Sequence, residues 1–405
     1  MEKYEEELIK YIDENDERYK EIARKIHEKP EVSNYEFFSS KLLADTLSAN
    51  GFDVKIDAAN HRTGFTAVKK SDKKGPVLVF LAEYDALEGL GHGCGHNLIG
   101  TISVFAAIAL SKFLDNFGGE VRVYGTPGEE GGENGSAKED FVNLGYFKDV
   151  DIALETHPNI VNTLTPKSLA LDPVDIEFFG KAAHAGVSPE QGINALDALI
   201  LTYNGINALR QHLTSDVKIH GIVLDGGTAP NIVPDYSRGR FYIRADTRER
   251  VNEVRKKVLN IVKGAALSTG CTYKMDLFQN KVDNLVPNKK LDEVYERYLN
   301  ELSQEYERDI KFASTDAGNV SQVIPTLHTG IKITNGNYSL HTVEFKDAAV
   351  SKDGLNAINL GAKLLSLTGL KLLSEPSLVE EIKEYHIIKK WSLKIRRYHI
   401  FLYML

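Results

Sequence analysis

The stretch Ala82-Glu83-Tyr84-Asp85-Ala86-Leu87-Glu88-Gly89-Leu90-Gly91-His92-Gly93-Cys94-Gly95-His96-Asn97 places acids, imidazoles and a thiol among glycines. It follows the apolar run 77–81, which predicts a buried parallel strand, and it precedes the apolar run 98–110, which has the length of a helix. The candidate ligands therefore lie where a strand ends and a helix begins. Binding sites in open α/β sheets are usually found there, so this loop is expected to form half of a metal site.

Strands and helices are expected to alternate on both sides of this loop. Such alternation is typical of an α/β domain in which helices cover a mostly parallel sheet. Expected strands are 65–69, 77–81, 120–124, 152–154 and 330–333, and expected helices are 98–117, 136–144, 291–302 and 354–367. A capping box, Ser136 to Glu139, is expected to begin the helix at 136.

A second domain is predicted within the first, at residues 168–282. The alternating strand 174–178 opens it, and a helix (196–209), two strands (217–224 and 238–245), a helix (251–267) and a strand (273–278) follow. This β-α-β-β-α-β order is typical of a ferredoxin-like module. The remaining sequence, 1–167 and 283–375, forms a discontinuous domain, and 376–405 forms a tail.

The tail mixes basic pairs such as Lys389-Lys390 and Arg396-Arg397 with Ile, Trp, Tyr and Leu. A helix on a membrane surface or against a partner has such a composition. An extension without a selected role is the other interpretation, and the sequence leaves both open.

Composition favours a cytoplasmic enzyme. The 405 residues predict two domains, and a net charge of -8 with a pI near 5.9 argues against a nucleic-acid partner. Two cysteines are too few for a disulfide framework. The sequence begins with charged residues rather than a signal peptide, and it contains no apolar run long enough to span a bilayer.

Three loops that follow expected strands carry metal-donor residues. Cys94 and His96 lie in the first, Glu129-Glu130 in the second and His157 in the third, and His341 adds a further imidazole. A hydrolytic site with two metals needs about five to six donors and a nearby carboxylate that accepts a proton from water. Adjacent glutamates can divide these tasks, one as ligand and one as general base.

Each residue alone has a simpler explanation. An isolated cysteine is more often a small buried apolar residue, paired glutamates are usually solvated, and a histidine before proline is usually a packing residue. The occurrence of such donors at three strand ends favours the metal site.

Several segments together resemble the di-metal amidohydrolases related to aminoacylase and carboxypeptidase G. The Gly-Cys-Gly-His-Asn loop resembles the branch that contains p-aminobenzoyl-glutamate hydrolases, indole-acetyl-amino-acid hydrolases and β-alanyl-lysine-type dipeptidases. The resemblance extends from about residue 19 to 370. The segments that carry it are 82–97, 125–132, 180–186, 194–198, 229–234 and 339–342.

The resemblance implies a role for each donor. Glu129 would be the general base for a metal-bound water, and Cys94 would be a ligand shared by the metals. Glu83 or Asp85 would orient a ligand imidazole without binding metal. The implied metal ligands are Cys94, His96, Glu130, His157 and His341.

The inserted domain would then serve as a lid and as the surface of a homodimer. The resemblance implies that His184, contributed by a second subunit, donates to the oxyanion and that Asn231 assists it. Arg244 would bind a substrate carboxylate, although an exposed strand arginine is the simpler interpretation.

The expected reaction is the hydrolysis of the amide bond in an N-acyl or aminoacyl amino acid or a dipeptide. Two divalent ions are expected, and Zn²⁺, Mn²⁺ and Co²⁺ all suit Cys, His and Glu donors. One alternative is a catalytically silent metal-binding scaffold, which has no need of Glu129. Another is a di-metal phosphoesterase, which the thiolate ligand disfavours.

Overall fold

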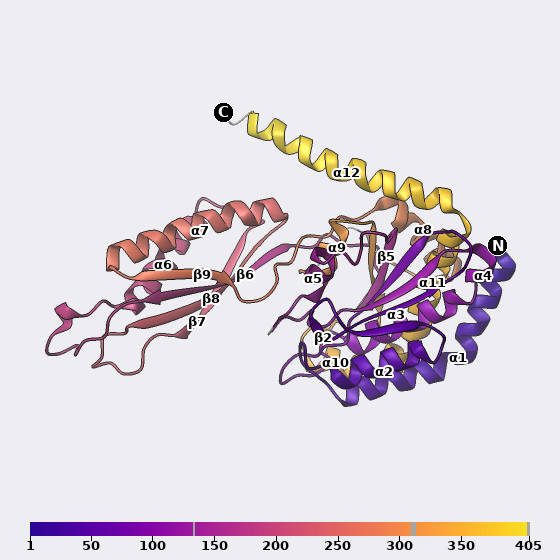
Figure 1. Cartoon of the computed structure of the whole chain (residues 1–405), viewed down its shortest axis with the longest axis horizontal. Helices are drawn as coiled ribbons and strands as arrows, with labels where there is room; N and C mark the ends of the chain where they lie inside the picture. The colour runs from indigo at the N-terminus through magenta and orange to yellow at the C-terminus, as the bar shows by residue number, and fades with distance from the viewer. Residues whose placement is uncertain (133, 309–312, 403–405) are drawn as a thin grey trace. The chain divides into compact units, whose positions relative to one another are not determined.

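The computed structural model describes residues 1–132, 134–308 and 313–402, with side chains up to residue 391. The chain forms two compact units (Figure 1). The first comprises Met1–Lys167, Leu285–Phe312 and Asp316–Leu405, and the second, which we call the inserted unit, comprises Ser168–Asn284 and Ala313–Thr315.

The first unit contains a six-stranded sheet with the order β1-β2-β4-β3-β5-β10. β2 is antiparallel to both of its neighbours, and the pairs β4–β3, β3–β5 and β5–β10 are parallel. The carboxyl ends of β3, β4 and β5 therefore meet at one edge of the sheet, where the donor loops begin. The strands are β1 (Asp53–Ala58), β2 (His61–Lys70), β3 (Val77–Ala82), β4 (Glu120–Gly125), β5 (Ile152–Asn159) and β10 (Thr326–Lys332).

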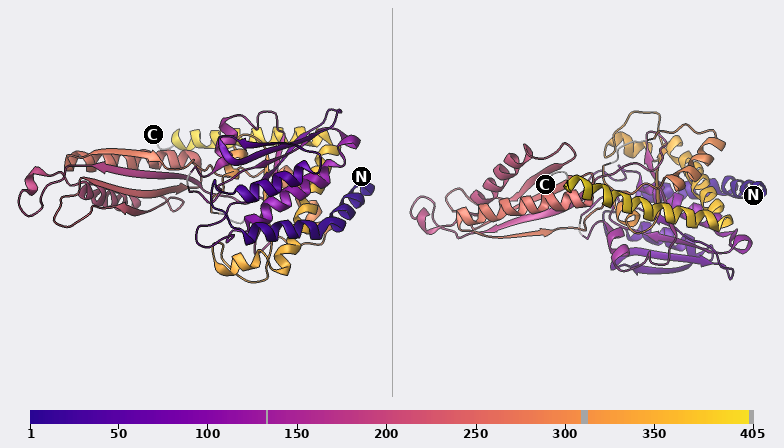
Figure 2. Two further views of the ribbon diagram at one scale, coloured as in Figure 1. Left: turned by 60° about the horizontal axis from the view of Figure 1, so that its bottom comes forward. Right: turned by 90° about the horizontal axis from the view of Figure 1, so that it is seen from above.

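Helix α3 (His96–Ser111) anchors this edge, because every one of its residues is buried. A helix that is apolar on all sides must be covered on all sides, and α1 (Glu2–Glu28) and α11 (Lys352–Ser374) pack against it (Figures 1 and 2). Its large side chains, such as Leu98 and Phe105, each contribute roughly 1.5–3 kcal/mol by burial. The other helices of this unit are α2 (Phe37–Ser48), α4 (Leu114–Phe117), α5 (Ala137–Asn143), α8 (Lys289–Glu301), α9 (Ala317–Ser321), α10 (Val343–Ala348) and α12 (Pro376–Leu402).

The inserted unit has a four-stranded antiparallel sheet with the order β7-β8-β6-β9. Burial alternates along β8, so one face of the sheet packs on α6 and α7 while the other carries Arg238, Arg240 and Arg244. The predicted fold class is confirmed, including the β-α-β-β-α-β order. The elements are β6 (Ala170–Phe179), the short 3₁₀ helix Pro189–Gln191, α6 (Ala195–Arg210), β7 (Lys218–Asp225), β8 (Tyr236–Ala245), α7 (Arg248–Thr269) and β9 (Thr272–Leu277).

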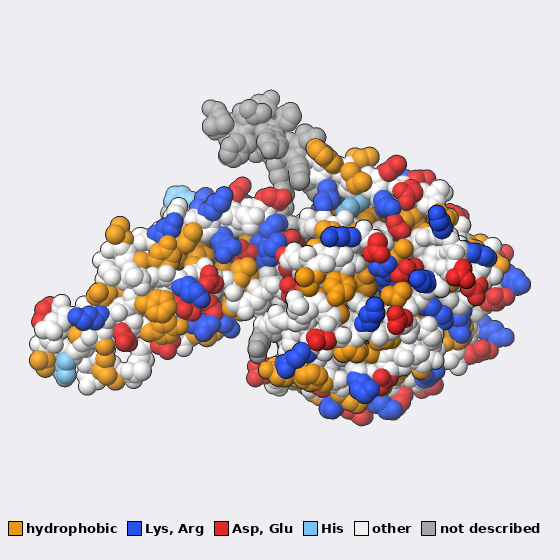
Figure 3. Space-filling model, in the orientation of Figure 1, with side chains coloured by type: hydrophobic (Ala, Val, Ile, Leu, Met, Phe, Trp, Pro, Cys, Tyr) orange, Lys and Arg blue, Asp and Glu red, His pale blue; other side chains and the backbone are white. Residues whose placement is uncertain are grey.

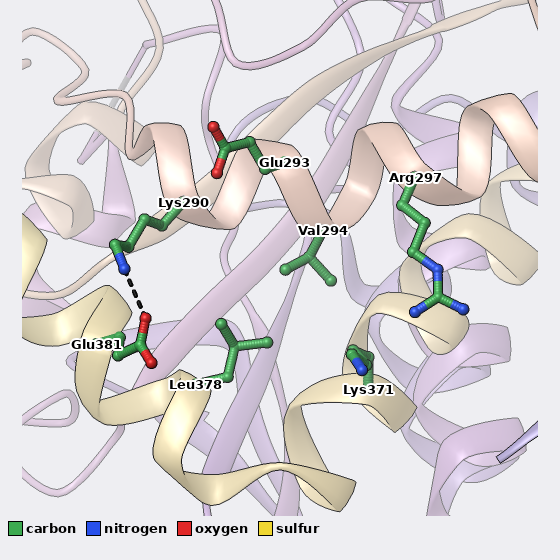
Figure 4. Close-up of a pocket in the computed structure, with 7 residues that line it drawn as sticks. All are labelled: Lys290, Glu293, Val294, Arg297, Lys371, Leu378 and Glu381. Carbon is green, nitrogen blue, oxygen red and sulfur yellow. Dashed lines mark hydrogen bonds and ion pairs between the residues drawn. The ribbon is translucent and has the colours of Figure 1, made fainter.

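The first part of the tail belongs to the core of the first unit. Val379 and Ile382 of α12 are buried in that core, and the Asn288 side chain donates to the Ile382 carbonyl at 2.9 Å. Lys290 of α8 and Glu381 of α12 point toward each other across a pocket of about 250 Å³ and form an ion pair at 2.6 Å (Figure 4). Ile387, Ile388 and Trp391 are exposed.

Charge on the surface is mixed in sign. Lys and Arg side chains are interspersed with Asp and Glu on the face shown in Figure 3. Among the described residues, no helix combines the length and apolar character needed to cross a membrane.

Candidate metal centre and active site

A left-handed glycine presents the first two donors. Gly95 is the N-cap of α3 with φ 78° and ψ 23°, and its N–H donates to the His92 carbonyl at 3.1 Å. A Cβ at this position would lie 2.8 Å from Pro158 Cγ. Glycine therefore meets both the backbone and the steric requirement, and it lets Cys94 and His96 approach the end of β5.

The structure brings the five predicted ligands together in two groups of three that share Cys94. Within each group the donor atoms lie within 4.8 Å of one another. Cys94 Sγ is 3.4 Å from His157 Nε2, and Glu130 Oε2 is 3.3 Å from His341 Nε2. The groups are Cys94, His96 and His157, and Cys94, Glu130 and His341.

These spacings fit a cation. Zinc–sulfur and zinc–nitrogen bonds of about 2.3 and 2.1 Å place tetrahedral ligands roughly 3.5 Å apart. Among the described residues, His96 Nε2 and Glu130 Oε1, which belong to predicted ligands, are buried polar atoms without a hydrogen-bond partner. Buried polar atoms are rarely left unsatisfied, and divalent cations would satisfy these.

One carboxylate contacts two of the predicted ligands. His96 Nδ1 donates to Asp85 Oδ1 at 3.0 Å, which leaves Nε2 for a metal, and the Glu130 backbone N–H donates to Asp85 Oδ2 at 2.9 Å. Such contacts fix the tautomer and the direction of a ligand imidazole. Asp85, one of the two residues predicted to orient a ligand imidazole, thus contacts the ring of the predicted ligand His96.

The other imidazoles are held by backbone contacts. His157 Nδ1 donates to the Pro158 carbonyl at 2.8 Å, so its Nε2 faces Cys94. The backbone N–H of His341 donates to the Gly93 carbonyl at 3.0 Å, and the His341 backbone has φ 64°. Residues other than glycine rarely adopt this left-handed conformation, and those that do are often found at functional sites.

Burial shifts the pKa values of the predicted donors Cys94 and His157 away from their ordinary values. Burial and the neighbouring Glu130 raise the pKa of the Cys94 thiol well above its ordinary value. Burial and the charge of His96 lower the pKa of His157 to about 3, so this ring is neutral and ready to bind a cation. A cation bound to the Cys94 sulfur would therefore release a proton.

Glu129 lies beside the ligands without belonging to either group. Its Oε2 is 3.9 Å from His96 Nε2, and its side chain is 10% exposed. Burial, followed by repulsion from Glu83 and Glu130, raises its pKa well above the ordinary value. A carboxyl group with a raised pKa and a path to solvent suits proton transfer.

The three remaining predicted residues lie in the inserted unit. His184 and Asn231 are exposed neighbours, because the Ala185 N–H donates to the Asn231 carbonyl at 3.0 Å. Arg244 of β8 is half-buried and donates to Ser314 Oγ at 2.8 Å.

Four polar residues beneath the centre were not predicted. Lys138 is fully buried between Glu83 and Asp316, and His328 Nδ1 lies 2.9 Å from Glu155 Oε2. Burial and repulsion from Glu83 raise the pKa of Glu155 to about 7. One signal existed for Glu155, since it stands two residues before His157 and would share a strand face with it. The unpredicted residues are Lys138, Glu155, Asp316 and His328.

Comparison with known proteins places the chain in a family. Residues 172–269 match a family model described as a peptidase dimerisation domain. The chain is 32% identical to human Xaa-Arg dipeptidase over 394 residues, which cover 92% of this chain and 89% of that protein. It is 37% identical to one of the p-aminobenzoyl-glutamate hydrolase subunits of Escherichia coli over 312 residues, which cover 71% and 64% of the two proteins.

Solved structures support the same fold. An aminobenzoyl-glutamate utilization protein from Klebsiella pneumoniae superimposes with a TM-score of 0.70 at 20% identity, covering 88% of this chain and 98% of the other. A Bacillus subtilis protein described as a dinuclear metal-binding peptidase of the M20 family superimposes with a TM-score of 0.63 at 17% identity, covering 92% and 99%. The resemblance in the sequence is thus confirmed, and the chain belongs to the M20 peptidase family as an amidohydrolase with the dimerisation domain of that family.

Proposed function

We propose that this enzyme binds two divalent cations and hydrolyses the amide bond of an N-acyl amino acid or a dipeptide. The observation that carries the proposal is the pair of three-donor groups sharing Cys94, with Glu129 beside them. The proposed ligands are Cys94, His96, Glu130, His157 and His341. The proposed ions are Zn²⁺, Mn²⁺ or Co²⁺.

The cations would supply polarisation of the amide carbonyl and a lowered pKa for an attacking water. Glu129 accepts the proton of that water and returns it to the departing amine, a role that its raised pKa supports. Asp85 keeps His96 and the Glu130 backbone in place during this transfer. His184, assisted by Asn231, donates to the oxyanion.

Arg244 is the proposed site for the substrate carboxylate. Guanidinium groups bind carboxylates through paired, charge-assisted hydrogen bonds, and the Arg244 side chain lies on the face of β8 that α6 and α7 leave uncovered. A substrate with a free carboxylate agrees with the named relatives, which include an Xaa-Arg dipeptidase and an N-acetyl-L-cysteine deacetylase.

We propose a homodimer through the inserted unit, which would act as a lid and contribute His184 to the partner's site. The dimerisation-domain match at residues 172–269 supports this assignment. The proposed location is the cytoplasm, because the Cys94 thiol must stay reduced to bind metal, and Cys94 and Cys271 are both free.

The test is a panel of Xaa-Arg dipeptides, p-aminobenzoyl-glutamate and N-acetyl amino acids, offered to metal-loaded protein and to Arg244→Gln. Loss of one charge-assisted hydrogen bond, about 1.5–3 kcal/mol, should raise KM roughly 10- to 150-fold. Substrates with an amidated carboxyl terminus should lose this difference between the two proteins.

Arg240→Gln is the matched control, because Arg240 lies on the same face of β8 but pairs with Asp175 at 2.8 Å. Its KM should stay near the wild-type value. Cleavage of no panel member by wild-type protein that holds two metals would favour the scaffold alternative.

A further inference from the structure

A buried ion triad lies directly behind the proposed metal centre. Lys138 Nζ is 2.5 Å from Glu83 Oε1 and 2.6 Å from Asp316 Oδ1, and all three side chains are fully buried. Asp316 Oδ2 also accepts the Lys138 backbone N–H at 3.1 Å. The proposed reaction assigns no role to this triad.

The second oxygen of Glu83 faces the metal donors. Glu83 Oε2 lies 3.4 Å from His96 Nε2, and Glu83, His96 and Glu129 form a third group whose donor atoms lie within 4.8 Å of one another. A carboxylate in this position is close enough to bind a cation. It would then occupy a coordination position that water needs, next to the proposed base.

Lys138 is the residue that restrains Glu83. Its ammonium group binds Oε1, so the carboxylate is fixed in direction and its negative charge is balanced. Asp316 holds Lys138 from the other side and prevents the ammonium from following Glu83 toward the donors. Burial excludes the water that would otherwise compete with both contacts.

We propose that Lys138 is a positioning residue of this hydrolase, which retains Glu83 by an ion pair and thereby keeps it from ligating the metals. The inference rests on the proposed function, since it assumes that the five ligands bind two cations. It adds a role for the triad: Lys138 preserves the open coordination position beside Glu129.

The test compares wild type with Lys138→Met, which keeps an unbranched apolar chain and removes the charge. Co²⁺ is the probe, because its visible absorption weakens as the coordination number rises. We expect Lys138→Met to bind two Co²⁺ per chain with weaker visible absorption than wild type. Its kcat should fall roughly 10- to 100-fold, as is typical when a residue that orders the surroundings of a metal site is lost, with little change in KM.

Two double variants separate this role from a general need for charge balance. The first combines Lys138→Met with Glu83→Gln and so removes the Glu83 carboxylate, the anion that would move to the metals. This double variant should restore the wild-type absorption and most of the kcat. Lys138→Met with Asp316→Asn neutralises the other carboxylate and should restore neither. Melting temperatures of all variants show whether each one folds.

Several results would overturn the proposal. Unchanged absorption and kcat in Lys138→Met would do so, as would equal rescue by the two double variants or the failure of both to fold. Loss of one metal from Glu83→Gln alone would show that Glu83 is itself a ligand. If wild-type protein binds no Co²⁺ or cleaves no substrate, the proposed function fails instead.

Discussion

Gly95→Ala should weaken metal binding more than Gly89→Ala, which adds a methyl group to the same donor loop. Gly95 lies between Cys94 and His96 with φ 78°, and the new Cβ would lie 2.8 and 2.9 Å from two ring carbons of Pro158. Pro158 follows His157 directly. The substitution therefore pushes the first donor loop away from the third donor.

Two contributions set the free-energy cost of Gly95→Ala. A left-handed alanine costs about 1 kcal/mol relative to glycine, and a methyl group forced into a packed site costs roughly 1–3 kcal/mol. If the sum of about 2–4 kcal/mol appeared entirely as lost affinity, the Kd for metal would rise roughly 30- to 700-fold, because 1.4 kcal/mol is tenfold. This value is an upper bound, since part of the cost will lower the free energy of unfolding.

Gly89→Ala is the control, because Gly89 has φ 74° in the same loop and a Cβ there would contact no atom within 4 Å. It carries the backbone cost without the clash. Competition between each protein and a chromophoric chelator for Zn²⁺ gives the affinities. Equal Kd values for the two variants would contradict this prediction, because the contact with Pro158 would then be without effect.

Two further predictions concern groups that support the centre and the tail. Asp85→Asn should lower metal affinity about 10- to 100-fold, because Asn cannot accept from both the His96 ring and the Glu130 N–H, and an unchanged affinity in the chelator competition would contradict this. Burial, with the charges of Lys390 and Lys389, lowers the pKa of His386 to about 4 from 6.5. Because the unfolded chain takes up this proton more readily than the folded one, the free energy of unfolding is unaffected above pH 6.5 and falls as the pH is lowered toward 4. The loss at pH 5.5 is about 1.4 kcal/mol. Urea unfolding at pH 7.5 and 5.5 should therefore show a smaller loss for His386→Leu than for wild type, and equal losses would contradict the prediction.

The parts of the fold that the sequence predicted are those with strong periodicity. Buried parallel strands such as β3 are continuous apolar runs, so their positions are clear. β1 was missed because it is mostly exposed and its sequence, Asp53-Val54-Lys55-Ile56, has no apolar run. β5 was predicted to end at residue 154, yet it pairs with β10 as far as Asn159, because the polar Glu155, Thr156 and His157 are buried within a strand.

Local signals predicted the donors, and long-range contacts could not be predicted. Cys94, His96 and Glu130 lie in or beside glycine-rich loops that follow strands, and His157 lies near the C-terminal end of β5. Their residue types and spacing therefore carry the information. Lys138 pairs with residues 55 and 178 positions away, and no local pattern reveals that such a lysine is buried. The prediction of a capping box at Ser136 was wrong, because Ser136 has φ 65° and its side chain makes no capping hydrogen bond.

Proton transfer by Glu129 beside two bound cations is the proposed chemistry of this enzyme. The most direct test measures metal content and amidase activity together, for wild type and Glu129→Ala. We expect two metals per chain in both proteins and a rate about 10²- to 10⁴-fold lower in the variant. Equal rates in the two proteins at equal metal content, or no cleavage by either, would contradict it.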